Sequence, residues 1–243
     1  MYNIVNIEML PDIFNVGSVI SLSRGQITRR SLSYAIARLL REKKLVKIKN
    51  GKYSKTVDPF YVSAMIYNGY IGLSSALFML GLKTEVEAEI YVCTEGGQGK
   101  ATRFMDKTIT PVNMSRQFYG ASTVNYDERD VLVSTYPKTI FDMLSKPAYA
   151  NYFDMYRAMN LKPLSKAEWK YLSYYLCNSS TSDIRRGGYA TDGIAPQWFT
   201  RKLKRLSDIR MGVSFFFKHR AINYSSKWKL YDDIGMARWN NAV

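Results

Sequence analysis

The run LVKIKNGKYSK, at residues 45–55, constrains the fold of this chain more than any other segment. Residues 46–49 alternate between apolar and basic side chains, with the period of a half-buried strand. Asn50 and Gly51 follow, and an Asn-Gly pair favours a two-residue hairpin because both residues tolerate positive φ. We therefore expect a two-stranded ribbon here. Its basic side chains, expected close together, are those of Lys47, Lys49 and Lys52.

A basic amphipathic helix is predicted just before this ribbon, between Thr28 and Lys44. Thr28 is the expected N-cap because its hydroxyl can accept hydrogen bonds from backbone N–H groups of the first turn. The apolar stripe, at helical spacing, consists of Leu32, Ile36, Leu39 and Leu40. The opposite face carries Arg30, Tyr34, Ala37, Arg38 and Arg41. One face would pack on the protein while the other, cationic and aromatic, would suit a DNA major groove.

A shorter apolar helix is expected upstream, over residues 16–22. The turn that follows is Arg24-Gly25-Gln26, in which Gly25 can adopt the positive φ that tight turns require. A helix, a short turn, a longer basic helix and a hairpin follow one another in the order of a winged helix-turn-helix. Residues 1–57 are therefore predicted to form a winged helix-turn-helix DNA-binding domain.

The positive charge of the chain is concentrated in this same region. Between Arg24 and Lys55 there are five arginines and six lysines against one acid, Glu42, a net +10 of the formal +15. A docking surface for a polyanion shows such concentration, whereas a coat of solubilising charge is spread over the molecule. The predicted partner is double-stranded DNA.

Two groups of side chains are expected to contact the DNA differently, because base contacts specify sequence while phosphate contacts position the protein. The residues expected near base edges are Arg29, Arg30, Ser31 and Tyr34. The residues expected on phosphates are Arg38, Lys47, Lys49 and Lys52. The predicted DNA-binding set is completed by Arg24, Gln26 and Thr28, which precede the basic helix.

Residues 58–243 are predicted to form one mixed α+β domain of antitoxin-like or effector type, so the fold class of the whole chain is α+β. The boundary is expected at Asp58-Pro59, because the residue before a proline is disfavoured in helix. Helices are expected over residues 74–80, 136–144, 163–176 and 199–206, the third opening on a Ser165–Glu168 capping box. Strands are expected over residues 89–94, 131–134 and 226–231, and over residues 108–112 at a sheet edge, because Pro111 lacks an N–H.

Five segments together carry a family resemblance. They are QITRRSLSYAIARLLREKKLVKIKNGKYS, FYVSAMIYNGYIGLSSALFMLGL, STYPKTIFDMLSKP, IRRGGYATDG and INYSSKWKLYDDIG. They resemble the AbiEi family of bacterial and archaeal antitoxin-type transcriptional regulators, in which a recognition helix precedes a basic wing ending in Gly-x-Tyr. The sequence departs from the family at Lys44, where glycine is usual, and at Asp192, where glutamate is usual.

The resemblance implies a winged-helix domain that binds an operator, often inverted repeats ahead of its own operon, and so represses its own synthesis. It also implies a C-terminal domain that opposes a nucleotidyltransferase-like toxin encoded alongside, without holding that toxin in a stable complex. Because an inverted repeat needs two copies side by side, we expect a homodimer on the DNA.

The sequence contains no catalytic constellation, metal-ligand cluster or cofactor motif, so a non-enzymatic regulator is expected. The Gly-rich segment at residues 96–101 does not meet the spacing of a phosphate loop. Glu85, Glu87 and Glu89 would share one face of a strand. They keep open the alternative of a nucleic-acid-processing enzyme whose winged helix delivers the substrate. A winged helix that makes only protein contacts is a further alternative, and it predicts no salt-dependent DNA affinity.

An aromatic cluster in the C-terminal part has two interpretations. Tyr174, Tyr175 and Trp198 could form a stacking platform for a base, although aromatic residues at helical spacing more often belong to the core.

The cellular compartment is predicted from what the chain lacks. No apolar run approaches the roughly 18–20 residues of a membrane span, and the acidic N-terminal segment is unlike a signal peptide. Cys93 and Cys177 are too few for a disulfide framework or, with the single His219, for a structural zinc site. We expect a cytoplasmic protein with no membrane partner.

Overall fold

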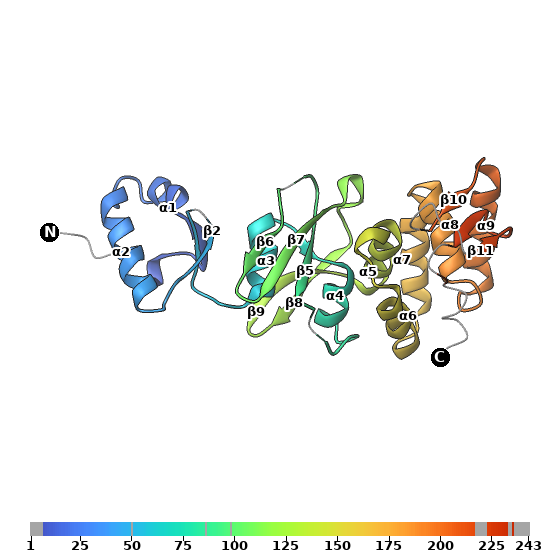
Figure 1. Cartoon of the computed structure of the whole chain (residues 1–243), viewed down its shortest axis with the longest axis horizontal. Helices are drawn as coiled ribbons and strands as arrows, with labels where there is room; N and C mark the ends of the chain where they lie inside the picture. Colours follow the sequence, from blue (N-terminus) through green and yellow to red (C-terminus); the bar gives the residue numbers. More distant parts are fainter. Residues whose placement is uncertain are drawn as a thin grey trace.

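The chain folds into a mixed α+β structure whose elements follow one another along the long axis of the molecule in chain order (Figure 1). The computed structural model describes residues 7–49, 51–85, 87–97, 99–216, 223–232 and 235. Asn50 of the predicted hairpin turn and His219 lie outside these described residues. In the described chain, helices are all too short or too polar to cross a bilayer.

The first part of the chain contains two helices and a small antiparallel sheet. The helices are α1 (Val16–Leu22) and α2 (Arg29–Arg41), preceded by a single 3-10 turn, η1 (Ile7–Met9). The three-stranded sheet has the order β1-β3-β2, built from β1 (Ile13–Asn15), β2 (Val46–Lys49) and β3 (Lys52–Ser54). The predicted hairpin is confirmed, because β2 and β3 pair in antiparallel fashion. The third strand of the sheet was not predicted: β1 pairs with β3 along the other edge.

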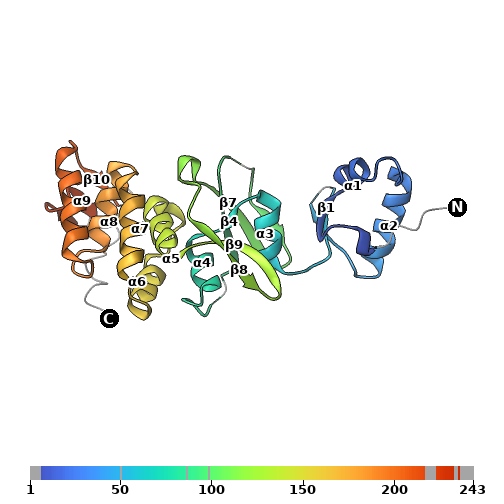
Figure 2. The same cartoon turned by 180° about the vertical axis from the view of Figure 1, so that it is seen from behind.

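A six-stranded sheet forms the middle of the molecule, in the order β6-β7-β5-β4-β9-β8. Its strands are β4 (Tyr70–Ile71), β5 (Glu89–Thr94), β6 (Thr102–Phe104), β7 (Lys107–Asn113), β8 (Ala121–Tyr126) and β9 (Arg129–Ser134). The helix α3 (Pro59–Tyr67) lies on the side of this sheet toward α1 and α2. The helix α4 (Leu73–Met79) lies on the other side, as both views show (Figures 1 and 2).

The last part of the chain is mainly helical and packs on the face of the sheet that α4 covers. Its helices are α5 (Tyr136–Ser145), α6 (Tyr152–Leu161), α7 (Lys166–Cys177), α8 (Thr181–Ala190) and α9 (Gln197–Ile209). A second three-stranded sheet, in the order β10-β12-β11, consists of β10 (Ser214–Phe215), β11 (Asn223–Ser225) and β12 (Leu230–Asp232). The 3-10 turns η2 (Ser115–Gln117) and η3 (Pro147–Tyr149) complete the described elements.

Several local predictions are confirmed. The helix α4 ends before Gly81, whose φ of +70° provides the left-handed position expected after the last turn. The helix α7 begins after Ser165, and both hydrogen bonds of the Ser165–Glu168 capping box are present. Strands β5 and β9 cover two of the four segments predicted to be strands, residues 89–94 and 131–134. Caps and alternation were sufficient to define these elements.

Pro111 does not confine its strand to the sheet edge, contrary to our prediction. The strand β7 is second in the sheet and pairs in parallel with β5 along its whole length. On its other side β6 pairs only with residues 107–109, so no strand neighbour on that side faces Pro111. The missing N–H is therefore tolerated inside the sheet because the neighbouring strand is too short to need it.

The segment predicted as a strand over residues 226–231 is mostly a turn, and β12 begins only at Leu230. Trp228 is completely buried here and its indole Nε1 donates to Asp192 at 3.0 Å. A Cβ added at Gly188 would lie 2.1 Å from the Trp228 ring, so only glycine permits this approach. The Gly-Gly-Tyr segment of α8 and the Lys-Trp segment thus pack on each other.

An ion pair is buried between α5 and the six-stranded sheet. The ammonium of Lys138 and the carboxylate of Asp142 are in direct contact, and both side chains are fully buried. The Tyr70 hydroxyl bridges them, accepting from Lys138 at 2.9 Å and donating to Asp142 at 3.0 Å. Each charge therefore has hydrogen-bonding partners, as a buried pair requires.

Candidate nucleic-acid interface

The helix α2 presents one apolar face to the protein and one basic face to solvent. Its buried residues are Leu32, Ala35, Ile36 and Leu39, which pack with α1, β1 and the chain after α2. Arg29 and Arg30 are exposed. Tyr34 is 76% exposed, and no other aromatic side chain described between residues 7 and 57 is more exposed. The predicted helical stripe is confirmed, with Ala35 replacing the half-buried Leu40.

The start of α2 is fixed by its cap. The Thr28 hydroxyl accepts from the backbone N–H of Ser31 at 3.2 Å, and the Ser31 hydroxyl donates to the Thr28 carbonyl at 2.9 Å. Both hydroxyls are therefore engaged in hydrogen bonds at the start of α2. Arg24 and Gln26 are exposed in the turn before it, where Arg24 and Gly25 have positive φ values of 47° and 84°.

Replacing Thr28 with alanine is expected to destabilise α2 by about 1 kcal/mol, because the first turn loses its side-chain acceptor. Amide hydrogen exchange within α2 would measure the loss. Ser33→Ala is the matched control, since Ser33 is exposed in the same helix and alanine has the higher helix propensity. Equal exchange rates in the two variants would contradict the capping role.

The basic side chains further along the chain differ in how free they are. Arg38 is only partly exposed, and its guanidinium lies 3.8 Å from the carboxylate of Glu42. Lys44 contacts the same carboxylate at 2.9 Å, and its hydrogen bond lowers the pKa of Glu42. The single acid of this segment therefore partly offsets the charge at the C-terminal end of α2, and leaves the N-terminal end of the helix more positive.

The three lysines of the hairpin do not form one cluster. Lys49 and Lys52 face each other across β2 and β3, whereas Lys47 faces Tyr53. The Lys52 ammonium donates to the Ile66 carbonyl of α3 at 3.4 Å, and the Lys49 ammonium lies 5.3 Å from the Tyr67 ring. Partial burial, together with the charge of Lys52, lowers the pKa of Lys49.

A groove of about 530 Å³ runs between the start of α1, the start of α2 and the hairpin turn. It is lined by Asn15, Val16, Gly17, Ile20, Ser21, Arg29, Gly51 and Lys52. Sequence reasoning missed Asn15 and Ser21 here. Asn15 could have been recognised as the N-cap of α1, where its side chain accepts from the Ser18 N–H at 2.6 Å.

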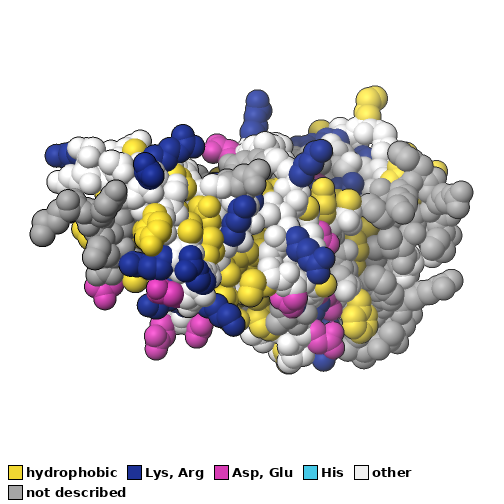
Figure 3. Space-filling model, turned by 60° about the vertical axis from the view of Figure 1, so that its left-hand side comes forward, with side chains coloured by type: hydrophobic (Ala, Val, Ile, Leu, Met, Phe, Trp, Pro, Cys, Tyr) yellow, Lys and Arg dark blue, Asp and Glu magenta, His cyan; other side chains and the backbone are white. Residues whose placement is uncertain are grey.

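The wider surface is also rich in positive charge. Figure 3 brings the α1–α2 end of the molecule forward, and Lys and Arg side chains are spread over the visible face. Asp and Glu side chains lie mainly along the lower edge of that view.

The three carboxylates that kept an enzyme in consideration do not form a shared site. Glu85 and Glu87 precede the strand, which begins at Glu89. Glu87 accepts from Ser74 at 2.7 Å and from Lys83 at 2.5 Å, and Glu89 accepts from Tyr91 at 3.0 Å. Among the described residues, no group of three His, Cys, Asp or Glu side chains is arranged to hold a metal ion.

No protein-family model and no curated protein matches this sequence. Among solved structures, the crystal structure of the RV2827C protein from Mycobacterium tuberculosis superposes with a TM-score of 0.60. The match covers 96% of this chain and 91% of that chain, at 14% sequence identity. It therefore shows a shared fold over nearly the whole length of both proteins.

Proposed function

We propose that this protein is a sequence-specific regulator of transcription that binds double-stranded DNA through a winged helix-turn-helix at residues 1–57. The observation that carries the proposal is the orientation of α2, which buries its apolar stripe and leaves Arg29, Arg30 and Tyr34 exposed. A helix of this kind, with its basic N-terminal residues free, fits the width of a major groove.

The exposed residues divide into two roles under this proposal. Arg29, Arg30 and Tyr34 reach base edges, since they occupy the first turns of α2. Lys47 binds phosphate, because it is exposed on β2 opposite Tyr53, whereas Lys49 and Lys52 contact α3. The groove beside α1, which Arg29 and Lys52 help to line, adds positive charge next to the start of α2.

The resemblance to AbiEi-type antitoxins extends the proposal to regulation of the protein's own operon. The operator would be an inverted repeat read by two copies, and residues 58–243 would oppose a nucleotidyltransferase-like toxin encoded alongside. The proposed protein is not an enzyme and acts in the cytoplasm. A C-terminal domain with the antitoxin role needs no cofactor.

The proposal is tested by measuring binding of the full chain to labelled DNA from upstream of its own gene and to a scrambled duplex, across a salt series. Preference for the upstream DNA that survives near physiological salt is the expected result. Equal affinity for both duplexes that is lost as salt rises would contradict the proposal, because non-specific attraction between DNA and a basic protein would explain it.

Two arginine and lysine variants separate base reading from phosphate contact. Arg30→Ala is expected to cost about 1–3 kcal/mol on the operator and to reduce the preference over scrambled DNA. Lys47→Ala is expected to weaken both duplexes alike and to lower the salt slope by about one.

Lys49→Ala is the matched control for Lys47→Ala, because both lysines are exposed on β2 but Lys49 lies against the Tyr67 ring. We expect it to change the salt slope less. If Arg30→Ala and Lys47→Ala lose affinity uniformly on both sequences, the docking of α2 in the major groove is wrong.

A further inference from the structure

An aromatic hollow lies on α7, in the helical part of the molecule away from the proposed DNA-binding surface. Its volume is about 550 Å³, and Ala167, Lys170, Tyr171, Tyr174 and Tyr175 line it. A hollow of this size is within the range of about 300–1,000 Å³ that small-molecule and nucleotide sites occupy. Nothing in the proposed regulatory function uses it.

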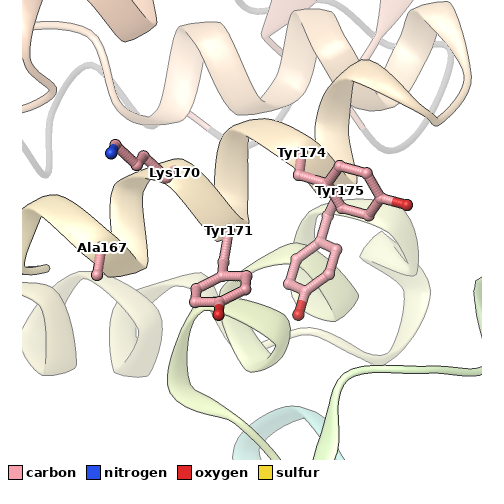
Figure 4. Close-up of a pocket in the computed structure, with 5 residues that line it drawn as sticks. All are labelled: Ala167, Lys170, Tyr171, Tyr174 and Tyr175. Carbon is pink, nitrogen blue, oxygen red and sulfur yellow. The ribbon is translucent and has the colours of Figure 1, made fainter.

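The tyrosines of the hollow combine a fixed ring with two exposed ones. Tyr175 is only 6% exposed, and its ring packs on Tyr119 at 5.4 Å and on Phe141 at 5.7 Å. Tyr171 and Tyr174 are 59% and 60% exposed. Figure 4 shows the rings of Tyr171 and Tyr175 leaving α7 on the same side, as their spacing of four residues requires. Tyr174 also packs edge-on against Tyr175, with the ring centroids 5.9 Å apart. The arrangement is therefore a buried ring that supports largely exposed rings, on which a ligand can stack.

The charge around the hollow selects an anionic ligand. None of its lining residues is acidic, and Lys170 borders it from the other side of α7. Lys166, one turn earlier on the same helix, is exposed as well. Glu168 is occupied by the capping box with Ser165 and by Lys162 at 3.8 Å. A cationic ligand would be repelled here, although tyrosine rings alone would attract one.

Stacking rings beside exposed lysines match the chemistry of an unstacked base next to a phosphate. Bases inside a duplex have both faces covered by their neighbours, so a duplex cannot offer a base to this surface, whereas a single strand can. Burial raises the pKa of the Tyr175 phenol, which therefore stays protonated and neutral at neutral pH.

We propose that this hollow binds a single-stranded nucleic acid, stacking a base on the exposed rings of Tyr171 and Tyr174, which the buried Tyr175 supports, with Lys170 beside the adjoining phosphate. This activity is separate from the duplex binding proposed for α2. Of the predicted aromatic cluster, Tyr175 belongs to the core, Tyr174 with Tyr171 forms the proposed stacking surface, and Trp198 does not line the hollow.

The test is fluorescence anisotropy of a short fluorescein-labelled oligouridylate with the full chain. The double variant Tyr171→Ala/Tyr174→Ala is expected to lose affinity about tenfold or more, since stacking on two rings is removed. The double variant Tyr171→Phe/Tyr174→Phe keeps the rings and is expected to bind within about threefold of the unaltered protein. Both variants should bind the upstream duplex as the unaltered protein does.

Two further variants control for other sources of binding. Phe153→Ala removes an aromatic side chain of similar exposure from α6 and is expected to change nothing. Arg30→Ala lowers duplex binding at α2 and is expected to leave oligouridylate binding intact. The proposal is overturned if the unaltered protein does not bind the oligonucleotide. It is also overturned if the alanine pair binds like the phenylalanine pair, or if Arg30→Ala abolishes the binding.

Discussion

Lys138→Met is expected to lower the free energy of unfolding by about 3–5 kcal/mol, the largest loss we expect from any single exposed or buried charge. The substitution leaves the Asp142 carboxylate fully buried without its ammonium partner, held by the Tyr70 hydroxyl at 3.0 Å and the weaker Cys93 thiol donor at 3.9 Å. Urea denaturation of the full chain, followed by far-ultraviolet circular dichroism, measures the change. A loss below about 1 kcal/mol would contradict the assignment of a fully buried pair.

The double variant Lys138→Met/Asp142→Leu distinguishes the loss of the ion pair from the cost of a buried carboxylate without its partner. Because both charges are replaced by apolar side chains of similar size, it is expected to recover most of the lost stability. A loss equal to that of the single variant would show that the interaction with Tyr70, and not the ion pair, dominates.

The destabilisation caused by Lys138→Met should depend on pH. Burial already raises the pKa of Asp142, and removing Lys138 removes an interaction that opposes this rise. Asp142 then binds a proton more tightly in the folded variant than in the unfolded chain. The stability of the variant therefore falls as the pH rises from the pKa of Asp142 in the unfolded chain to its higher pKa in the folded variant. The loss relative to the unaltered protein should therefore be larger at about pH 7 than at about pH 5. An identical loss at both values would contradict this account.

Trp228→Ala is expected to cost about 3–5 kcal/mol, because it removes the largest fully buried side chain of the C-terminal part. The substitution also leaves the Asp192 carboxylate without the indole donor at 3.0 Å, and it opens the space above Gly188. Since Gly188 lies in α8, the variant should loosen the packing between α8 and the last sheet. Urea denaturation and near-ultraviolet circular dichroism would measure the loss.

Trp198→Ala is the control of the same residue type. Trp198 is 40% exposed on α9, so we expect a loss of about 1 kcal/mol. Similar losses in the two tryptophan variants would show that Trp228 does not hold the C-terminal sheet in place.

Features that depend on neighbouring residues in the sequence were predictable. The face of α2, its Thr28 cap and the Ser165–Glu168 capping box each follow from spacing within one element. The exposure of Arg30 and Tyr34 followed in the same way, because a helix that buries Leu32 and Ile36 must turn these residues to solvent. Arg29 lies on the side of Leu32 and is exposed because it is the first residue of the helix.

Features that depend on distant segments were not predictable from the sequence. The strand β1 has only three residues and shows no alternation, so its pairing with β3 left no local signal. Pro111 lies inside the sheet because the neighbouring strand β6 ends before it. The length of β6 cannot be predicted from the residues around Pro111. The contacts of Lys49 and Lys52 with α3 join residues that are 14 or more positions apart in the sequence. The sequence pattern of the hairpin therefore does not predict them.

The contacts between the hairpin and α3 determine how the rest of the molecule would be oriented on a bound duplex. Ile48 packs with Phe60 and its neighbours in the core of the middle sheet, and Lys52 bonds to the Ile66 carbonyl. The connection between the two parts, residues 55–58, is too short to act as a flexible tether. A duplex held by α2 would therefore fix the direction in which α5–α9 project from it. Two copies on an inverted repeat would have a set angle between their far ends, and only certain separations of the two half-sites would let those ends meet.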